Sequence, residues 1–156
     1  MRRLGVRELS AVCAFALGAL VLSCGGGDGP IKRGADLTGS EEVPPVTTDG
    51  SGSLELKIAR DGSQIRYKLA VEGLTNVLFA HIHVGPPGVN GPVILNLATS
   101  SFTEIEGDLT AADLAPAPAQ GINNFADAIA AIEDGGTYSN VHTAANPGGE
   151  IRGQIE

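Results

Sequence analysis

The sequence is poor in aromatic residues and in cysteine. Its 156 residues include no tryptophan, two tyrosines, four phenylalanines, one methionine and two cysteines, but 22 glycines. Both cysteines, Cys13 and Cys24, lie close to the N-terminus, which excludes a disulfide-stapled scaffold for the rest of the chain. The composition predicts one small domain with many turns around an aliphatic core.

Basic residues are also scarce. The chain has 10 lysines and arginines but 18 aspartates and glutamates, which gives a formal charge of −8. The first 23 residues hold three of the arginines and one of the glutamates, so the chain without them carries −10. An acidic domain repels nucleic acid and anionic lipid headgroups, and we therefore expect no nucleic-acid partner. Attachment to a membrane would require an anchor.

No apolar run is long enough to span a bilayer. The run from residue 11 to residue 22 has 12 residues and follows three arginines, Arg2, Arg3 and Arg7. A bilayer-spanning helix needs about 20 apolar residues, whereas a secretory signal needs about 7 to 15 after a basic start. The N-terminal segment is therefore typical of a secretory signal.

The residues after this run, Val21-Leu22-Ser23-Cys24, resemble the bacterial lipobox, in which the cysteine is lipidated and becomes the new N-terminus. We expect a lipoprotein signal peptide over residues 1–23, a flexible tether over 24–34 and one domain over 35–156. The protein would then be extracytoplasmic and anchored to the bacterial cell envelope by lipid on Cys24. The alternative is an ordinary signal peptide with a cysteine at its cleavage site.

Alternating apolar and polar residues predict a series of short, half-buried strands. One segment instead has helical spacing, with Phe125, Ile129 and Ile132 after Asn124 as the N-cap, and predicts a helix that ends near Glu133. We expect an all-β, Greek-key-like antiparallel β-sandwich or barrel of about eight strands with one short helix. The expected strands cover residues 35–37, 53–58, 64–72, 78–84, 93–97, 103–109, 138–143 and 150–155.

All three histidines share the parity that points away from the core. In Leu78–Val84 the aliphatic side chains alternate with His81 and His83, so burial of the aliphatic face turns both histidines the other way. The same parity places His142 outward on a later strand. Glu150 and Arg152 follow this pattern near the C-terminus and are candidates for a second shell around the histidines.

Two histidines at positions i and i+2 of a strand lie about 6.6 Å apart along it and can converge on one ion. His142 from a neighbouring strand would complete a three-nitrogen zinc or copper site with His81 and His83. The alternative is structural, with the histidines bonded to loop carbonyls and to Glu150.

The sequence specifies no catalytic nucleophile with a base beside it. Ser100 and Ser139 lack the Gly-x-Ser-x-Gly context of serine hydrolases. Glu41 and Glu42 precede Pro44-Pro45 and predict an exposed bend rather than a carboxylate site. A non-enzymatic role is therefore expected.

Three segments resemble the CHRD domain, a module named after chordin and present in many bacterial secreted proteins. They are LTGSEEVPPVTTDGSGSLEL, AHIHVGPPGVNGPVILNL and YSNVHTAANPGGEIRGQI, and together they span most of residues 35–156. The resemblance implies an extracytoplasmic β-sandwich used for binding. The expected function is thus a lipid-anchored binding or interaction module with an unknown envelope or extracellular protein partner.

A weaker similarity is to copper/zinc superoxide dismutase, which also has a β-barrel with His-x-His on one strand, a later histidine and a C-terminal arginine. His81, His83, His142 and Arg152 follow that order. The dismutase's bridging histidine, zinc subsite and disulfide cysteines have no counterpart. The similarity implies, as the alternative function, a mononuclear copper- or zinc-binding redox protein whose Arg152 draws anions toward the metal.

Overall fold

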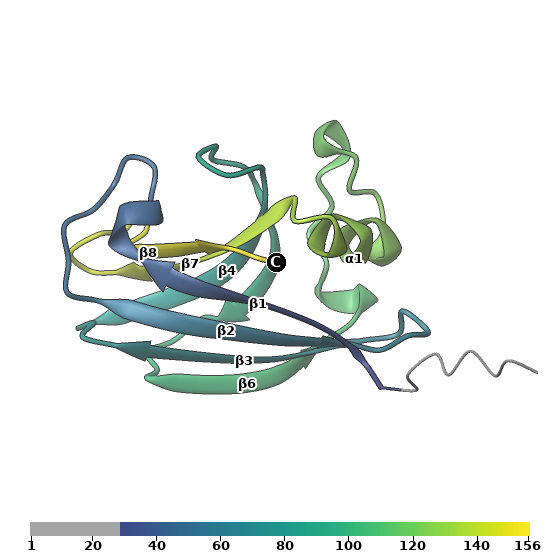
Figure 1. The fold of residues 1–156 in the computed structure, drawn as a ribbon, viewed down its shortest axis with the longest axis horizontal. Coiled ribbons are helices and arrows are strands. Elements are labelled where there is room, and N and C mark those ends of the chain that lie inside the picture. Colours follow the sequence, from purple (N-terminus) through teal and green to yellow (C-terminus); the bar gives the residue numbers. More distant parts are fainter. Residues whose placement is uncertain (1–28) are drawn as a thin grey trace, which may run out of the picture.

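The computed structural model describes residues 29–156, so the expected signal peptide, Cys24 and the tether as far as residue 28 lie outside the described residues. The described part contains eight strands and one α-helix (Figure 1). In chain order these are β1 (Ile31–Thr38), β2 (Ser51–Ile58), β3 (Ile65–Glu72), β4 (Val77–Val84), β5 (Val93–Ala98), β6 (Glu104–Leu109), α1 (Phe125–Glu133), β7 (Thr137–Thr143) and β8 (Ile151–Gln154).

The strands form one antiparallel sheet in the order β5-β4-β7-β8-β1-β2-β3-β6. The sheet curls until its two end strands, β5 and β6, contact each other, which gives a nearly closed barrel (Figure 1). The expected all-β class, strand number and single helix are confirmed. None of the helices in residues 29–156 has the length and apolar character needed to cross a bilayer.

The barrel interior is aliphatic, as the period-two alternation requires. On β2 and β3, Leu54 pairs with Leu69, and Ile58 pairs with Ile65, all of them at most 2% exposed. Tyr67 also points inward, and its hydroxyl donates a 2.6 Å hydrogen bond to the Leu97 carbonyl, so its polar end is satisfied. Contacts between the paired side chains on this face stabilise the sheet.

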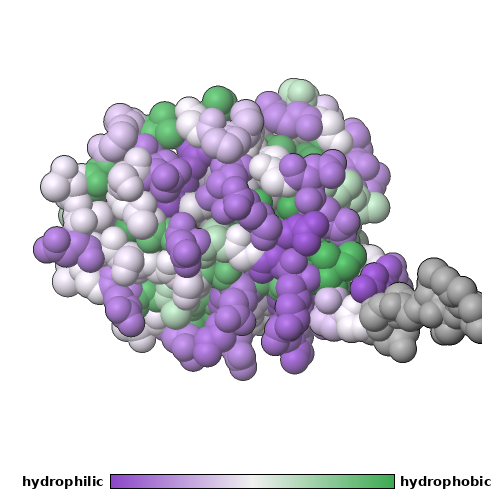
Figure 2. Space-filling view, viewed as in Figure 1, coloured by the Kyte–Doolittle hydropathy of each residue, from purple (hydrophilic) through white to green (hydrophobic). Residues whose placement is uncertain are grey.

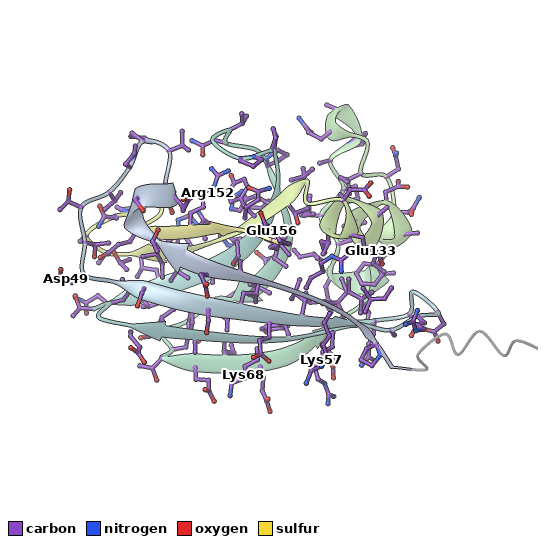
Figure 3. The ribbon with its side chains drawn as sticks, in the orientation of Figure 1. Asp49, Lys57, Lys68, Glu133, Arg152 and Glu156 are labelled. Atoms are coloured by element: carbon purple, nitrogen blue, oxygen red, sulfur yellow. The ribbon has the colours of Figure 1, made fainter. Side chains whose placement is uncertain are left out.

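The opposite face of β2, β3 and β6 is solvated and charged. Lys57 and Lys68 project from it into solvent (Figure 3), and hydrophilic side chains cover much of this side of the surface (Figure 2). Arg66 pairs with Asp108 at 2.9 Å, but both side chains are exposed, so the pair contributes little to stability. Charged residues along the end strand β6 instead disfavour edge-to-edge association.

Helix α1 covers one end of the barrel (Figure 1). Asn124 caps it in a reciprocal box with Asp127, in which each side chain accepts a hydrogen bond from the other residue's backbone N–H. The buried face carries four side chains that join the barrel core: Phe125, Ala128, Ile129 and Ile132. The expected helix bounds are confirmed.

Two expectations about the strands are wrong. Leu78 was expected in the core but is 37% exposed, because it is the extra residue of a bulge where β4 pairs with β7, and Val77 is buried in its place. Residues 31–34, expected in the tether, are the first half of β1 and pair with β2. Their alternation is too weak to reveal a strand in the sequence.

Replacing Ile132, which is fully buried, with alanine should lower the free energy of unfolding by roughly 2 to 5 kcal/mol, because the cavity cannot collapse between helix and sheet. Ile132→Val removes one methylene and should cost about 0.5 to 1.5 kcal/mol. Chemical denaturation measures both. Unchanged midpoints would show that α1 does not pack on the barrel.

Candidate functional site

The outer face of β4, β7 and β8 is covered by loops instead of solvent. All seven residues of β7 are buried, although alternate ones point away from the barrel core. The cover comes from three loops, residues 39–50, 85–92 and 144–150. Two of them are joined by a 2.8 Å hydrogen bond from the Asn90 side chain to the Val43 carbonyl. The polar residues therefore point away from the barrel core, as expected, but loops shield this face from solvent.

Arg152 holds the 85–92 loop against this face. It is 1% exposed, and its guanidinium lies over the Tyr138 ring, 3.4 Å from the ring centroid. It donates hydrogen bonds of 3.0 Å to the Asn90 side chain and 3.0 Å to the Val89 carbonyl. Figure 3 shows Arg152 among the loops, away from the solvent-facing lysines. Three of the guanidinium's hydrogen bonds thus go to the 85–92 loop, which gives Arg152 a structural role here.

Other contacts fix the same loop. The side-chain amide of Gln154 donates to the Gly85 carbonyl at 3.1 Å, and the Gly91 N–H donates to the Tyr138 hydroxyl at 3.1 Å. Gly91 lies so close to the Val84 carbonyl that a Cβ would overlap it. The loop therefore requires glycine at this position.

The structure brings the three histidines together on the covered face. In the β4–β7 register, His142 lies opposite Phe79, one step along the face from His81. The ring centroid of His81 is 5.0 Å from that of His142 and 5.6 Å from that of His83. One ring nitrogen from each histidine lies within 4.8 Å of the others. Within the described chain, no cysteine or carboxylate joins this cluster.

His83 is 8% exposed and stacks on Tyr138, with ring centroids 4.8 Å apart. Its Nδ1 lies 2.8 Å from the Gly91 carbonyl. Because a carbonyl can only accept, Nδ1 carries the hydrogen and Nε2 of the neutral ring is an acceptor. That Nε2 is buried and has no hydrogen-bond partner among residues 29–156.

His142 and His81 differ in their partners. Nδ1 of His142 lies 2.9 Å from the Pro147 carbonyl, and its Nε2 lies 3.0 Å from Oδ1 of Asn140, so both ring nitrogens face oxygen acceptors and a neutral ring donates to one of them. The His81 ring stacks on Phe79, and its Nδ1 is buried without a partner in the described part of the chain. Two of the three histidines thus bond to loop carbonyls, as the structural alternative expects, and two leave a buried nitrogen unused.

All three imidazoles are held neutral at pH 7. Burial, together with the nearby His142 and His83 rings, lowers the pKa of His81 to about 4. Burial also lowers the pKa values of His83 and His142, against the opposing hydrogen bonds to Gly91 and Pro147. Neutral rings keep the nitrogen lone pairs that a metal ligand needs.

Glu150 does not contact the histidines. Its carboxylate accepts hydrogen bonds from the hydroxyls of Thr143 and Thr48, the latter at 2.7 Å. Burial raises the pKa of this carboxyl, but the two hydroxyls outweigh burial and the net pKa is lowered. These bonds go to threonines and not to the histidine rings, and they tie the end of β7 to the 39–50 loop.

A second buried carboxyl at this face belongs to Glu42, which the sequence placed in an exposed bend. It is 5% exposed, and burial raises its pKa while Arg152 and the Asn140 side chain oppose that rise. No signal in the sequence reveals its burial, because it lies in a loop with no periodicity. Asn140 and Tyr138 share the parity of His142 on β7 and lie on the same face as the histidines.

Arg152→Lys should lower the free energy of unfolding by about 1.5 to 3 kcal/mol, because lysine cannot reproduce planar stacking on Tyr138 together with fixed bonds to the loop. Arg66→Lys, at an exposed site, should change it by less than about 0.5 kcal/mol. Denaturation and amide hydrogen exchange measure the effect. Equal stability of the two variants, with unchanged exchange in residues 85–92, would contradict the role assigned to Arg152.

Stability should fall with acid between about pH 6.5 and pH 4. The folded-state pKa of His81 is depressed, so the unfolded chain takes up its proton first, and the stability contribution is present above about 6.5 and lost as pH falls toward 4. His81→Gln should flatten this part of the curve. Urea unfolding at several pH values tests the slope, and identical slopes for both proteins would refute it.

The chain was compared with known proteins. A family model described as the CHRD domain matches residues 33–155. The search of curated proteins found no match, and neither did the search of solved structures. The match covers most of the chain, including most of β1, all of β2 to β8 and the three histidines. The chain therefore belongs to the CHRD domain family.

Proposed function

We propose that this protein is a non-catalytic binding module, held on the outer side of a bacterial membrane by lipid on Cys24. Its partners are the membrane, through the anchor, and an envelope or extracellular component that the domain binds. The observation that carries the binding role is the covered face of β4, β7 and β8. There, a rigid set of polar contacts leaves two buried ring nitrogens, Nδ1 of His81 and Nε2 of His83, without a hydrogen-bond partner in residues 29–156.

Preorganisation supports binding at this face. Arg152, Gln154 and Tyr138 hold the 85–92 loop, and that loop holds the His83 ring through the Gly91 carbonyl. A site fixed in advance loses little conformational entropy when a ligand arrives. The two unpartnered ring nitrogens are therefore held in position before a ligand binds, and little conformational entropy is lost on binding.

The hydrogen bonds of the histidines do not support catalysis by an activated nucleophile. In the described residues these bonds go to carbonyls and to the Asn140 amide, and none goes to a hydroxyl or thiol. A dismutase-like redox role is disfavoured as well. Arg152, which that role needs near the metal as an anion guide, is buried against Tyr138 and the loop.

The proposed anchor fits the position of β1. Only residues 25–30 separate Cys24 from Ile31, where the sheet begins. Six residues span at most about 21 Å when fully extended. The domain would be held close to the membrane, with the end that carries α1 and the start of β1 nearest to it (Figure 1).

Cys24→Ser should release the protein from the membrane fraction, because the thiol that takes the lipid is lost. Cys13→Ser is the matched control, and it should leave the mature protein in the membrane, since Cys13 departs with the signal peptide. Fractionation with intact-mass measurement reads out both. An unmodified N-terminus at another residue, or membrane retention of Cys24→Ser, would overturn the anchor.

A further inference from the structure

We propose that His81, His83 and His142 form a binding site for one first-row transition-metal ion, copper in preference to zinc. This inference rests on the proposed binding role and names the ligand class. The site lies outside the barrel core, under the loops that cover β4 and β7, with the partly exposed His81 as its solvent side.

Convergence of the donors is the first argument. The three rings come from two adjacent strands, and one nitrogen of each lies within 4.8 Å of the others. Ligation at about 2.1 Å requires nitrogens roughly 3 to 4 Å apart, so a ring movement of about 1 Å completes the geometry. His81 is the least buried of the three.

The second argument is the state of the two most buried rings. Histidines that bind metals usually donate the other ring N–H to a carbonyl or carboxylate, which fixes the tautomer and aims the lone pair. His83 donates to the Gly91 carbonyl, and Nδ1 of His142 lies against the Pro147 carbonyl. Nε2 of His83 therefore presents a lone pair. Nε2 of His142 faces Oδ1 of Asn140 and must leave that contact to bind a metal.

Two buried ring nitrogens in the cluster also lack hydrogen-bond partners among the described residues. Nε2 of His83 and Nδ1 of His81 are both buried and, within residues 29–156, bonded to nothing. Natural structures leave few such atoms, and a missing ligand is one of the recurring reasons. His142 would exchange its Nε2 contact with Asn140 for the metal, which weakens the site but does not block it.

The donor set selects the class of ion. Three neutral imidazoles suit copper and zinc, whereas calcium and magnesium require oxygen ligands. Affinity at nitrogen sites rises from zinc to copper, so copper should bind more tightly. Three protein ligands leave a further coordination position for water or for an exogenous group.

The test uses the full chain in detergent, purified without a polyhistidine tag and stripped with a chelator. Calorimetric titration with copper(II), zinc(II) and calcium(II) salts should give one copper and one zinc per chain, with copper tighter, and no calcium. The electron paramagnetic resonance spectrum of the copper complex should show coupling to nitrogen. Absence of stoichiometric copper and zinc binding would overturn the inference.

Variants locate the site. His81→Gln, at the partly exposed position, and His142→Gln should each weaken copper binding by more than the 10- to 100-fold typical for loss of an outer partner. A double variant, Glu104→Gln with Glu106→Gln on the exposed face of β6, should bind copper like the wild type. Cooperative thermal unfolding of each variant confirms that it folds. If His142→Gln does not fold, the copper affinity of His81→Gln alone tests the site.

The two proposals fail separately. Copper binding that survives His81→Gln, or that is lost in the glutamate double variant, would place the metal elsewhere and overturn the site. Membrane retention through Cys24 would be unaffected by that result. Failure of the anchor would likewise leave the metal titration unchanged.

Discussion

All seven residues of β7 are buried, so this strand needs cover on both of its faces. The barrel core supplies one cover, and the loops 39–50, 85–92 and 144–150 supply the other. Loops carry backbone polar groups that must be satisfied when they bury a surface. Arg152 donates hydrogen bonds to the 85–92 loop. Its stacking on Tyr138 also attaches that loop to β7.

The double cover sets the chemistry of the histidines. Burial under the loops lowers their pKa values and keeps the rings neutral. The loop carbonyls of Gly91 and Pro147 contact Nδ1 of His83 and His142, which directs both Nε2 atoms away from the loops, that of His83 without a partner in the described chain and that of His142 toward Asn140. A structural role and a ligand-binding role are therefore compatible, because the same contacts that hold the loops prepare the acceptors.

Much of the fold follows from local periodicity in the sequence. Alternation located most strands, and Asn124 with its helical spacing located α1, because both signals are carried by residues near one another in the chain. The parity of His81, His83 and His142 was also readable. The bulge at Leu78, the burial of Glu42 and the threonine partners of Glu150 were not, since each depends on a loop or strand distant in sequence.

The covered face thus fixes neutral histidine rings and leaves Nε2 of His83 as a bare acceptor among the described residues. Nitrogen-15 NMR of the imidazoles in the metal-free protein at pH 7 tests it most directly. We expect three neutral rings, with His83 and His142 protonated at Nδ1 and bonded there to the Gly91 and Pro147 carbonyls. A charged His83 ring, or one protonated at Nε2, would contradict this account of the site.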